Sequence, residues 1–263
     1  MNNSLLVVEG IHDATFFGVL LKEIGYSKLD DLEKVPELWR HLIPTTFPSK
    51  GKLEHVVHYP DIFLSSDANS SIAIVVGKSL SEIKNELKAA IAILPLDELK
   101  AIGLCLDADE DPGKSFTCAQ EIYADLNDWA LREGVFKEAL TVPASAEKFS
   151  DSYIRLGVFV SPNNSDQGAL ETTLIRLAAD RYPTLNEASA EFVKRVDGHH
   201  ANPHKDLKQF RKGGNVHKSH VGVISNILRP GSSLAVAIDQ CEWVPADHHV
   251  ALAEIRAFVK QLI

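Results

Sequence analysis

The sequence has few cysteines, and none of them has the spacing of a redox or zinc motif. Its 263 residues include only Cys105, Cys118 and Cys241, with no C-x-x-C pair. An odd, scattered set argues against both a disulfide framework and a zinc ribbon, and is typical of a reducing compartment. The first residues, MNNSLLVVEG, also lack the basic region and cleavage site of a signal peptide. We therefore expect a cytoplasmic protein.

The sequence also lacks a long apolar run and an excess of positive charge. No apolar stretch reaches the roughly 18 residues that a membrane span requires, so no membrane association is expected. The formal net charge is −9, whereas proteins that hold nucleic acid by charge alone are usually basic. Binding to a polyanion would therefore need metal ions, a local basic patch or a partner protein.

What the sequence does contain is a repeated alternation of short apolar runs with amphipathic segments. Each run is typical of a buried strand, and each is followed by apolar residues at helical spacing. The expected strands cover residues 4–8, 72–76, 101–106 and 154–160, and the expected helices cover 13–24, 80–94, 116–131 and a segment beginning near Gly168. This alternation predicts an α/β fold with a parallel sheet covered on both faces.

Two stretches interrupt the alternation. Residues 29–69 contain prolines and show little periodicity, which predicts an insertion or long connection with an edge strand near 55–59. After Asp197 comes GHHANPHKDLKQFRKGGNVHKSH, which we interpret as a mobile loop over a site, and a last helix is expected at 248–263. We therefore expect a core domain over residues 1–180 and a helical extension over 181–263 that carries this His/Lys-rich loop.

Carboxylates cluster at the ends of two expected strands. Glu9 ends the first run with Asp13 one helical turn later, and Asp107 and Asp109 follow the third run in LCLDADED. The ends of neighbouring parallel strands meet at one edge of a sheet, about 5 Å apart, and in an extended tip residues i and i+2 point the same way. Carboxylates crowded in this way repel unless a cation such as Mg²⁺ lies among them. The alternative for either motif is helix capping, for example by Asp109 or Asp111.

The order E-G-x-x-D after a first strand and D-x-D after a later one resembles the signature of Toprim domains. These occur in topoisomerases, bacterial primases, recombination-mediator proteins and nucleases of the OLD (overcoming lysogenisation defect) type, and the resemblance covers about residues 4–180. The segments VFVSPNNSDQGALETTL and VHKSHVGVISNILRPGSSLAVAI more closely resemble a stand-alone Toprim-like family of uncharacterised function. That family is similar in kind to phage-defence Toprim nucleases, which work beside an ABC-type ATPase.

This resemblance implies a metal site built from carboxylates. By it, Glu9 and Asp13 would hold one Mg²⁺ or Mn²⁺ ion, Asp107 and Asp109 would hold or share a second, and Glu171 would complete the outer site. Two such ions can activate a water and neutralise the leaving oxygen, and Glu9 is expected to serve catalysis directly. The alternative for Glu171 is an acid in the first turn of a helix, where it suits the helix dipole.

The resemblance also implies a catalytic lysine and points to one departure. Lys218 would stabilise the charge that develops in the transition state, although it could equally be an ordinary solvated lysine. Asn163 stands where the stand-alone family more often has Asp, so a metal ligand would be lost there, while Asn164 and Glu171 remain.

The His/Lys-rich loop is the one basic region of this acidic chain. Its cations could hold a phosphate backbone near the metals. The expected contacts are Lys205, Lys208, Arg211 and Lys212. A solvated loop without a ligand is the alternative. A zinc site is a further one, although the histidine spacing matches no standard finger and Pro203 breaks any helix between His200 and His204.

These observations predict a magnesium-dependent endonuclease that hydrolyses phosphodiester bonds of DNA or RNA, with an ABC-type ATPase as a partner by resemblance. The alternative is a non-catalytic Toprim-fold module that binds a partner ATPase or nucleic acid ends; a homo-oligomer is compatible with either. No nucleotide cofactor is expected, because the Gly77-Lys78-Ser79 stretch has Ile72 where a P-loop needs its first glycine.

Overall fold

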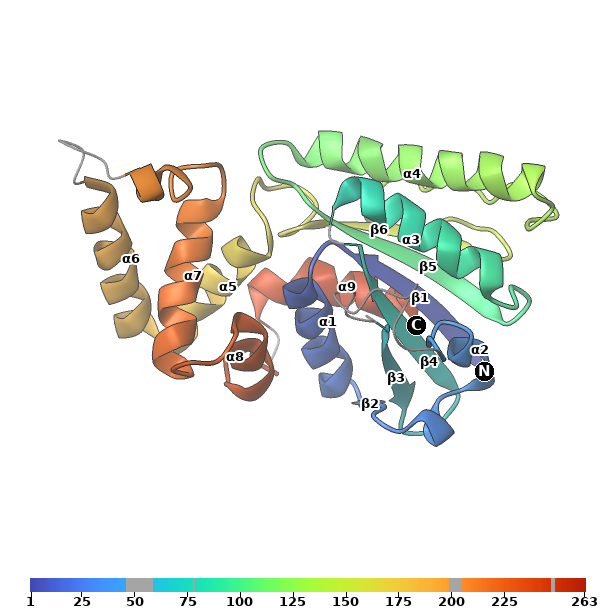
Figure 1. The fold of residues 1–263 in the computed structure, drawn as a ribbon, viewed down its shortest axis with the longest axis horizontal. Coiled ribbons are helices and arrows are strands. Elements are labelled where there is room, and N and C mark those ends of the chain that lie inside the picture. The colour runs from blue at the N-terminus through green and yellow to red at the C-terminus, as the bar shows by residue number, and fades with distance from the viewer. Residues whose placement is uncertain (46–58, 78, 199–204, 247–248) are drawn as a thin grey trace.

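A six-stranded sheet organises the fold, as the computed structural model shows (Figure 1). The structure describes residues 1–45, 59–77, 79–198, 205–246 and 249–263. The strand order is β2-β3-β4-β1-β5-β6. The strands are β1 (Asn2–Val8), β2 (Tyr26–Lys28), β3 (Asp61–Ser65), β4 (Ser70–Val76), β5 (Leu99–Asp107) and β6 (Arg155–Ser161).

The expected α/β fold is confirmed, but the sheet is mixed rather than wholly parallel. The strands β4, β1, β5 and β6 run parallel to one another, whereas β3 is antiparallel to both β2 and β4. The β3–β4 connection is a tight turn in which Asp67 accepts hydrogen bonds from Ser65 and Asn69. So short a connection permits only an antiparallel neighbour, because a parallel pair needs a crossover of a dozen residues or more.

The four expected strand–helix units are all present, with boundaries that differ by a few residues. The helices that follow their strands are α1 (Ile11–Glu23), α3 (Leu80–Ile93), α4 (Pro112–Arg132) and α5 (Leu170–Arg181). The edge strand expected at 55–59 lies outside the described residues except for Tyr59, which is not in a strand. The expected insertion also contains the short helices η1 (Leu32–Lys34) and α2 (Glu37–Arg40), besides β3.

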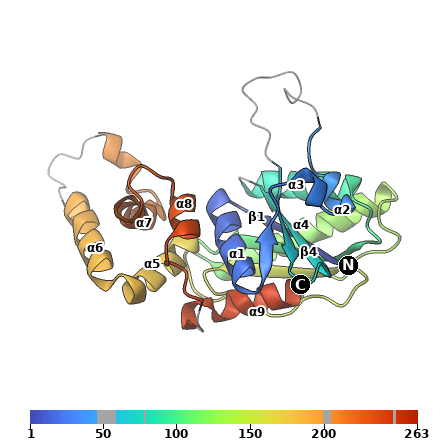
Figure 2. The same cartoon turned by 90° about the horizontal axis from the view of Figure 1, so that it is seen from below.

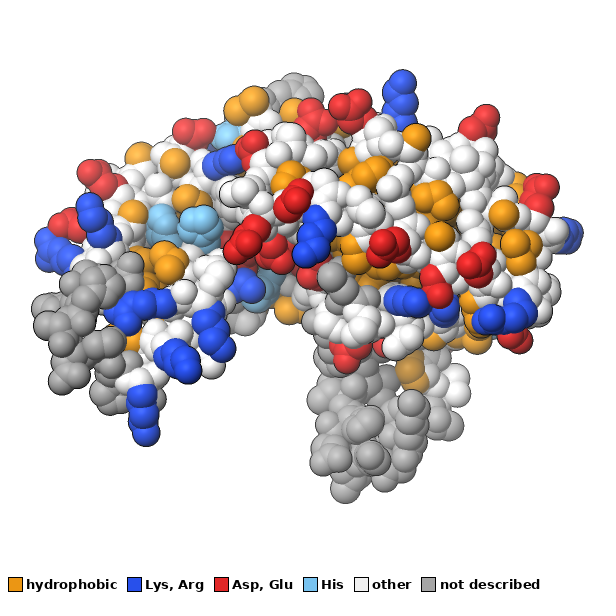
Figure 3. Space-filling view, turned by 90° about the horizontal axis from the view of Figure 1, so that it is seen from above, with side chains coloured by type: hydrophobic (Ala, Val, Ile, Leu, Met, Phe, Trp, Pro, Cys, Tyr) orange, Lys and Arg blue, Asp and Glu red, His pale blue; other side chains and the backbone are white. Residues whose placement is uncertain are grey.

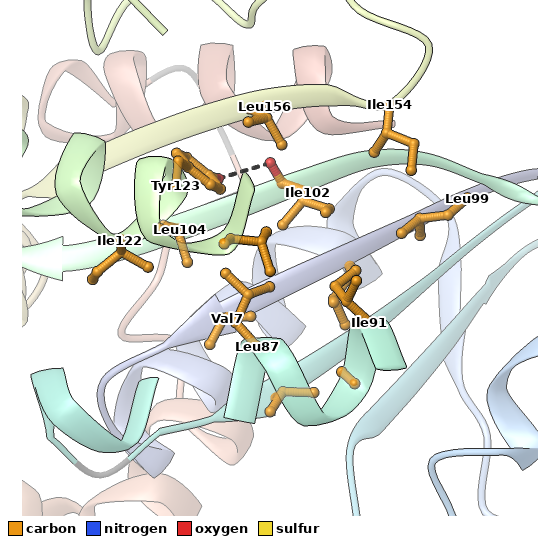
Figure 4. Close-up of a cluster of buried hydrophobic side chains, with 14 of the residues drawn as sticks. Val7, Leu87, Ile91, Leu99, Ile102, Leu104, Ile122, Tyr123, Ile154 and Leu156 are labelled. Atoms are coloured by element: carbon orange, nitrogen blue, oxygen red, sulfur yellow. Dashed lines mark hydrogen bonds between the residues drawn. The ribbon is translucent and has the colours of Figure 1, made fainter. Parts of the chain in front are cut away.

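Two hydrophobic layers cover the sheet, and β1 contributes to both by alternation. Leu5 and Val7 face the layer under α3 and α4, while Leu6 and Val8 face the layer under α1. In the first layer the Tyr123 hydroxyl lies 3.0 Å from the carbonyl oxygen of Ile102 (Figure 4). The sheet is thus packed on both faces, which leaves its edges and strand ends for function.

The end of the chain returns to the sheet. Helix α9 (Ala253–Leu262), preceded by η4 (Val250–Leu252), lies on the α1 side (Figure 2) and places Phe258 in the second layer. The Ser4 hydroxyl donates a hydrogen bond to the Leu262 carbonyl at 2.6 Å. A Cβ on Gly103 would lie 2.8 Å from the Phe258 ring, so this strand position needs a residue without a side chain.

The remaining helices form a second lobe beside the carboxyl ends of the strands (Figures 1 and 2). They are α6 (Pro183–Gly198), η3 (Lys205–Lys208), α7 (Asn215–Leu228) and α8 (Leu234–Gln240). The basic stretch is therefore a shorter loop than expected, because η3 lies within it and α7 already begins at Asn215. None of the described helices is both long and apolar enough to cross a membrane.

Candidate active site

The two acidic motifs meet at the carboxyl ends of β1 and β5. The strands are parallel neighbours, with Val8 opposite Cys105, so Glu9 and Asp107 leave the sheet at the same edge. The Glu9 carboxylate oxygen Oε1 accepts a hydrogen bond from the Asp107 backbone N–H at 3.0 Å. Glu9 therefore reaches from its own strand to the tip of the next one.

Asp13 lies in the first turn of α1, where it also has a structural task. Its Oδ2 accepts a hydrogen bond from the Gly10 N–H at 2.9 Å, which closes the start of the helix. Capping acids are usually solvated, whereas Asp13 is only 9% exposed. Burial, followed by the charges of Glu9 and Glu171, raises the pKa of Asp13 to about 7. A capping role alone does not explain this burial beside two other acids.

Asp107 experiences the strongest crowding of negative charge. Burial raises its pKa to about 9, and the charges of Asp13, Glu9, Glu171 and Asp109 add to the effect. Acids in α1 and α5 and in the loops after β1 and β5 thus act on one carboxyl group. Such a group needs a proton or a cation to be stable.

Asp109 takes part in the site differently from the prediction. Its φ of 48° is left-handed rather than extended, and its side chain is exposed, so it does not continue the strand. It exchanges two backbone hydrogen bonds of 2.8 Å with Gly168, in the loop after β6. Its charge still raises the pKa of Asp107 and Glu9. The cap of α4 is Asp111, which accepts from the Gly113 and Lys114 amides.

Gly168 ties the tip of β5 to the start of α5, and we expect Gly168→Ala to destabilise the protein. Its φ is +124°, and an added Cβ would lie 2.2 Å from Thr172 Oγ1. Backbone strain of this kind costs about 1–3 kcal/mol, and the clash adds to it. Urea unfolding should show the loss. Thr172→Ala in the same chain should recover the part due to the clash, less the hydrogen bond that Thr172 Oγ1 accepts from the Ala169 N–H. Equal stability of Gly168→Ala and wild type would contradict the description of this loop.

Glu171 and Lys218 approach the carboxylates from two helices. Glu171 is half-buried in the first turn of α5, and Lys218 is an exposed residue in the first turn of α7. Burial raises the pKa of Glu9; the Asp107 amide opposes this shift, Asp109 reinforces it and the Lys218 charge opposes it. The lysine therefore lies within electrostatic reach of Glu9.

His12 is a site residue that the sequence analysis missed. It is half-buried between Gly10 and Asp13 on α1. Burial lowers the pKa of His12, Glu171 opposes the shift and Lys218 reinforces it. The only signal in the sequence was its position inside the acidic motif, and a histidine there has no distinguishing spacing.

The loop after β6 explains what the amides at 163 and 164 do. Asn163 Oδ1 accepts hydrogen bonds from Ser165 and from the Asp166 amide at 2.8 Å, while its Nδ2 donates to Asp166 Oδ2. Asn164 Oδ1 accepts from the Val160 N–H at 2.8 Å. Both side chains therefore serve the loop itself.

The carboxylates of the site are the ligand type that a hard cation takes, although they are not close enough together to surround one. Among the described residues, no three His, Cys, Asp or Glu side chains lie close enough together to hold an ion as they stand. Carboxylate oxygens are the ligands that Mg²⁺ takes, usually one or two with several waters. Glu9, Asp13 and Asp107 are buried or half-buried and each has a raised pKa, so the residues fit a divalent ion.

The basic residues lie on the helical lobe. Lys205, Lys208 and Lys212 are exposed and Arg211 is half-buried. Figure 3 shows Lys and Arg side chains gathered on this lobe and Asp and Glu side chains over the middle of the molecule. Of the histidines in the His/Lys-rich stretch, His199, His200 and His204 lie outside the described residues. His217 is exposed and His220 is buried.

A groove elsewhere does not coincide with this chemistry. It lies between α1, α8 and β3 and is lined in part by Thr15, Lys22 and Asp239. Lys22 and Asp239 form an ion pair at 2.5 Å, and none of the site carboxylates lines the groove. The strand ends, rather than this groove, are the candidate active site.

Comparisons with known proteins show the family and the fold. The family model described as "Protein of unknown function (DUF3226)" matches residues 3–263, while the comparison with curated proteins finds no match. The crystal structure of a hypothetical protein from Pyrococcus horikoshii OT3 is similar over 100% of this chain and 94% of that chain, with a TM-score of 0.52 and 15% identity. At this identity the likeness shows the fold alone.

Proposed function

Because the chain belongs to the family described as protein of unknown function (DUF3226), which names no activity, we propose its function from the site: a metal-dependent, Toprim-like nuclease that hydrolyses phosphodiester bonds of DNA or RNA. One observation carries the proposal. Glu9 reaches the tip of β5 and accepts the Asp107 amide at 3.0 Å, within a group of acids whose mutual repulsion a cation would relieve.

The carboxylates and Lys218 would have different roles. Glu9, Asp13 and Asp107 would hold Mg²⁺ or Mn²⁺, with Asp109 and Glu171 at the periphery. When bound there, the ion supplies an activated water and neutralises the phosphate. Lys218 offers a positive charge within electrostatic reach of Glu9, where it would stabilise the charge that develops at phosphorus. The ends of β1 and β5 and the first turns of α1, α5 and α7 hold these groups in place before substrate binds.

The basic lobe supplies the phosphate contacts that an acidic protein otherwise lacks. Lys205, Lys208, Arg211 and Lys212 would hold the nucleic acid backbone beside the carboxylates. By its resemblance to phage-defence nucleases, the protein would act with an ABC-type ATPase that controls access to the site.

The second candidate is a non-catalytic interaction module of the same fold. The net charge of −9 favours it, because it weakens unaided binding to nucleic acid. Asn163 favours it as well, since its side chain is engaged within its own loop. Such a module would bind the partner ATPase or a nucleic acid end without cleaving it.

A cleavage assay separates the two. Plasmid, single-stranded DNA and tRNA are incubated with the pure protein in Mg²⁺, Mn²⁺ or EDTA, alone and together with a candidate ABC-type ATPase. Cleavage that requires the divalent ion supports the nuclease. Cleavage that persists in EDTA contradicts it, and no cleavage under any condition favours the module.

Replacing Lys218 by alanine should reduce cleavage about 10²-fold, the usual effect of removing one preorganised positive or hydrogen-bonding group. Stabilisation by Mg²⁺ should remain, because Lys218 is not a ligand. The matched control is Lys100→Ala. Lys100 is also exposed, but it lies on β5 at the end of the strand opposite to Asp107. Equal turnover by the two variants would remove Lys218 from the mechanism.

A further inference from the structure

The contact between α6 and α7 contains a buried histidine. His220, in α7, is 8% exposed, and its Nε2 lies 3.1 Å from the Asn186 carbonyl oxygen of α6. A carbonyl oxygen only accepts hydrogen bonds, so Nε2 carries the proton of the neutral ring and Nδ1 is unprotonated. The imidazole thus links the two helices through one hydrogen bond.

Two further buried polar atoms of α6 lack a hydrogen bond within the described part of the chain. The buried Asn186 Oδ1 and Ser189 Oγ, both on α6, find no hydrogen-bond partner among the described residues. A buried polar atom without a partner costs about 1–3 kcal/mol. Helix α6 is therefore held less firmly in its place than it would be if these atoms were hydrogen-bonded.

The surroundings of His220 oppose a positive charge. Burial lowers its pKa, the hydrogen bond to Asn186 opposes the shift, and the neighbouring His217 reinforces it. The helices α5, α6 and α8 contact α7, yet within the described chain no carboxylate of theirs is among the groups that act on this ring. Because the folded protein favours the neutral ring, its stability is complete above the ordinary value of 6.5 and falls as the pH drops below it.

Helix α7 also carries Lys218, two residues before His220, so movement of this helix moves the lysine. We propose that the α6–α7 contact is a pH-sensitive joint that loosens when His220 becomes charged and thereby withdraws Lys218 from the carboxylates. The second half of the proposal rests on the nuclease function proposed above. The first half concerns the fold alone.

Amide hydrogen exchange of the full chain between pH 7.5 and pH 5.0, corrected for intrinsic exchange rates, tests the joint. Protection in α6 and α7 should fall several-fold more than protection in α3, which lies on the far side of the sheet. His220→Gln, which retains an N–H donor but does not titrate, should abolish this difference, and His220→Asn serves if that variant folds poorly. His217→Gln should retain it.

Equal pH dependence of α7 protection in wild type and the His220 variants would overturn the proposal. If the nuclease function fails but the joint exists, the exchange result stands while no substrate is cleaved. If the joint fails, cleavage is present and its loss at low pH is the same in His220→Gln as in wild type.

Discussion

Replacing Glu9 by glutamine should remove metal-dependent cleavage and leave the fold intact. Glutamine keeps a carbonyl oxygen that can accept the Asp107 amide, the contact that Glu9 makes at 3.0 Å. What it loses is the negative charge that helps to hold the metal. Because metal ions carry most of the stabilisation in phosphodiester hydrolysis, we expect a fall of about 10²–10³-fold or more in turnover.

The control for this experiment is Glu86→Gln, an exposed carboxylate on α3, which should cleave like wild type. Both proteins are compared by cleavage rate and by urea unfolding. Full activity of Glu9→Gln would mean that the metal is held elsewhere or that a contaminant cleaves the substrate. Loss of activity together with loss of folding would be assigned to the fold, which is why the isosteric variant is preferred to alanine.

Replacing Asp107 by asparagine should stabilise the metal-free protein at pH 8 by at least about 1 kcal/mol, because the amide is neutral and no proton has to be bound there on folding. Its pKa is raised to about 9 from 3.8, so the folded protein binds a proton that the unfolded chain releases. Stability of the metal-free wild type therefore falls as the pH rises from about 4 to about 9. The variant should show a smaller fall in stability with rising pH. The fall that remains below about pH 7 is the contribution of Asp13, whose pKa is about 7.

Addition of Mg²⁺ should make the wild type more stable than Asp107→Asn. At a concentration one hundred times the dissociation constant, a bound ligand stabilises the folded state by about 2.7 kcal/mol, and this gain should be lost in Asp107→Asn. Urea unfolding in EDTA and in Mg²⁺ at pH 5 and pH 8 measures both effects. Asp97→Asn, an exposed residue just before β5, is the control. Wild type that is equally stable with and without the ion would count against a metal site.

Local pattern determined most of the elements. The apolar runs at 4–8 and 101–106 predicted β1 and β5 within two residues, because a strand buried on both faces needs continuous apolar residues. The strands β2 and β3 escaped prediction, since three and five residues within a weakly periodic stretch carry too little signal. They are held in the sheet by pairing, β3 with β4 and β2 with β3, and these partners lie outside each strand's own sequence.

The candidate site, like the fold, could be predicted only in part from the sequence. Convergence of Glu9 with Asp107 could be predicted from strand ends alone, because parallel neighbours in a sheet end at a common edge. The position of Asp109 could not be predicted, since its left-handed backbone accompanies the bridge to Gly168, 59 residues later in the chain. The place of His12 beside Glu171 and Lys218 likewise depends on how α5 and α7 pack.

The sequence by itself determined which residues are acidic, where the strands that carry them end, and hence that negative charge gathers at one edge of an α/β sheet. Only the tertiary structure decided how deeply each acid is buried, which helices bring Glu171 and Lys218 to it, and that α9 covers the sheet. Spacing along the chain is a local property. Burial and charge interaction depend on distances between segments that no local pattern encodes.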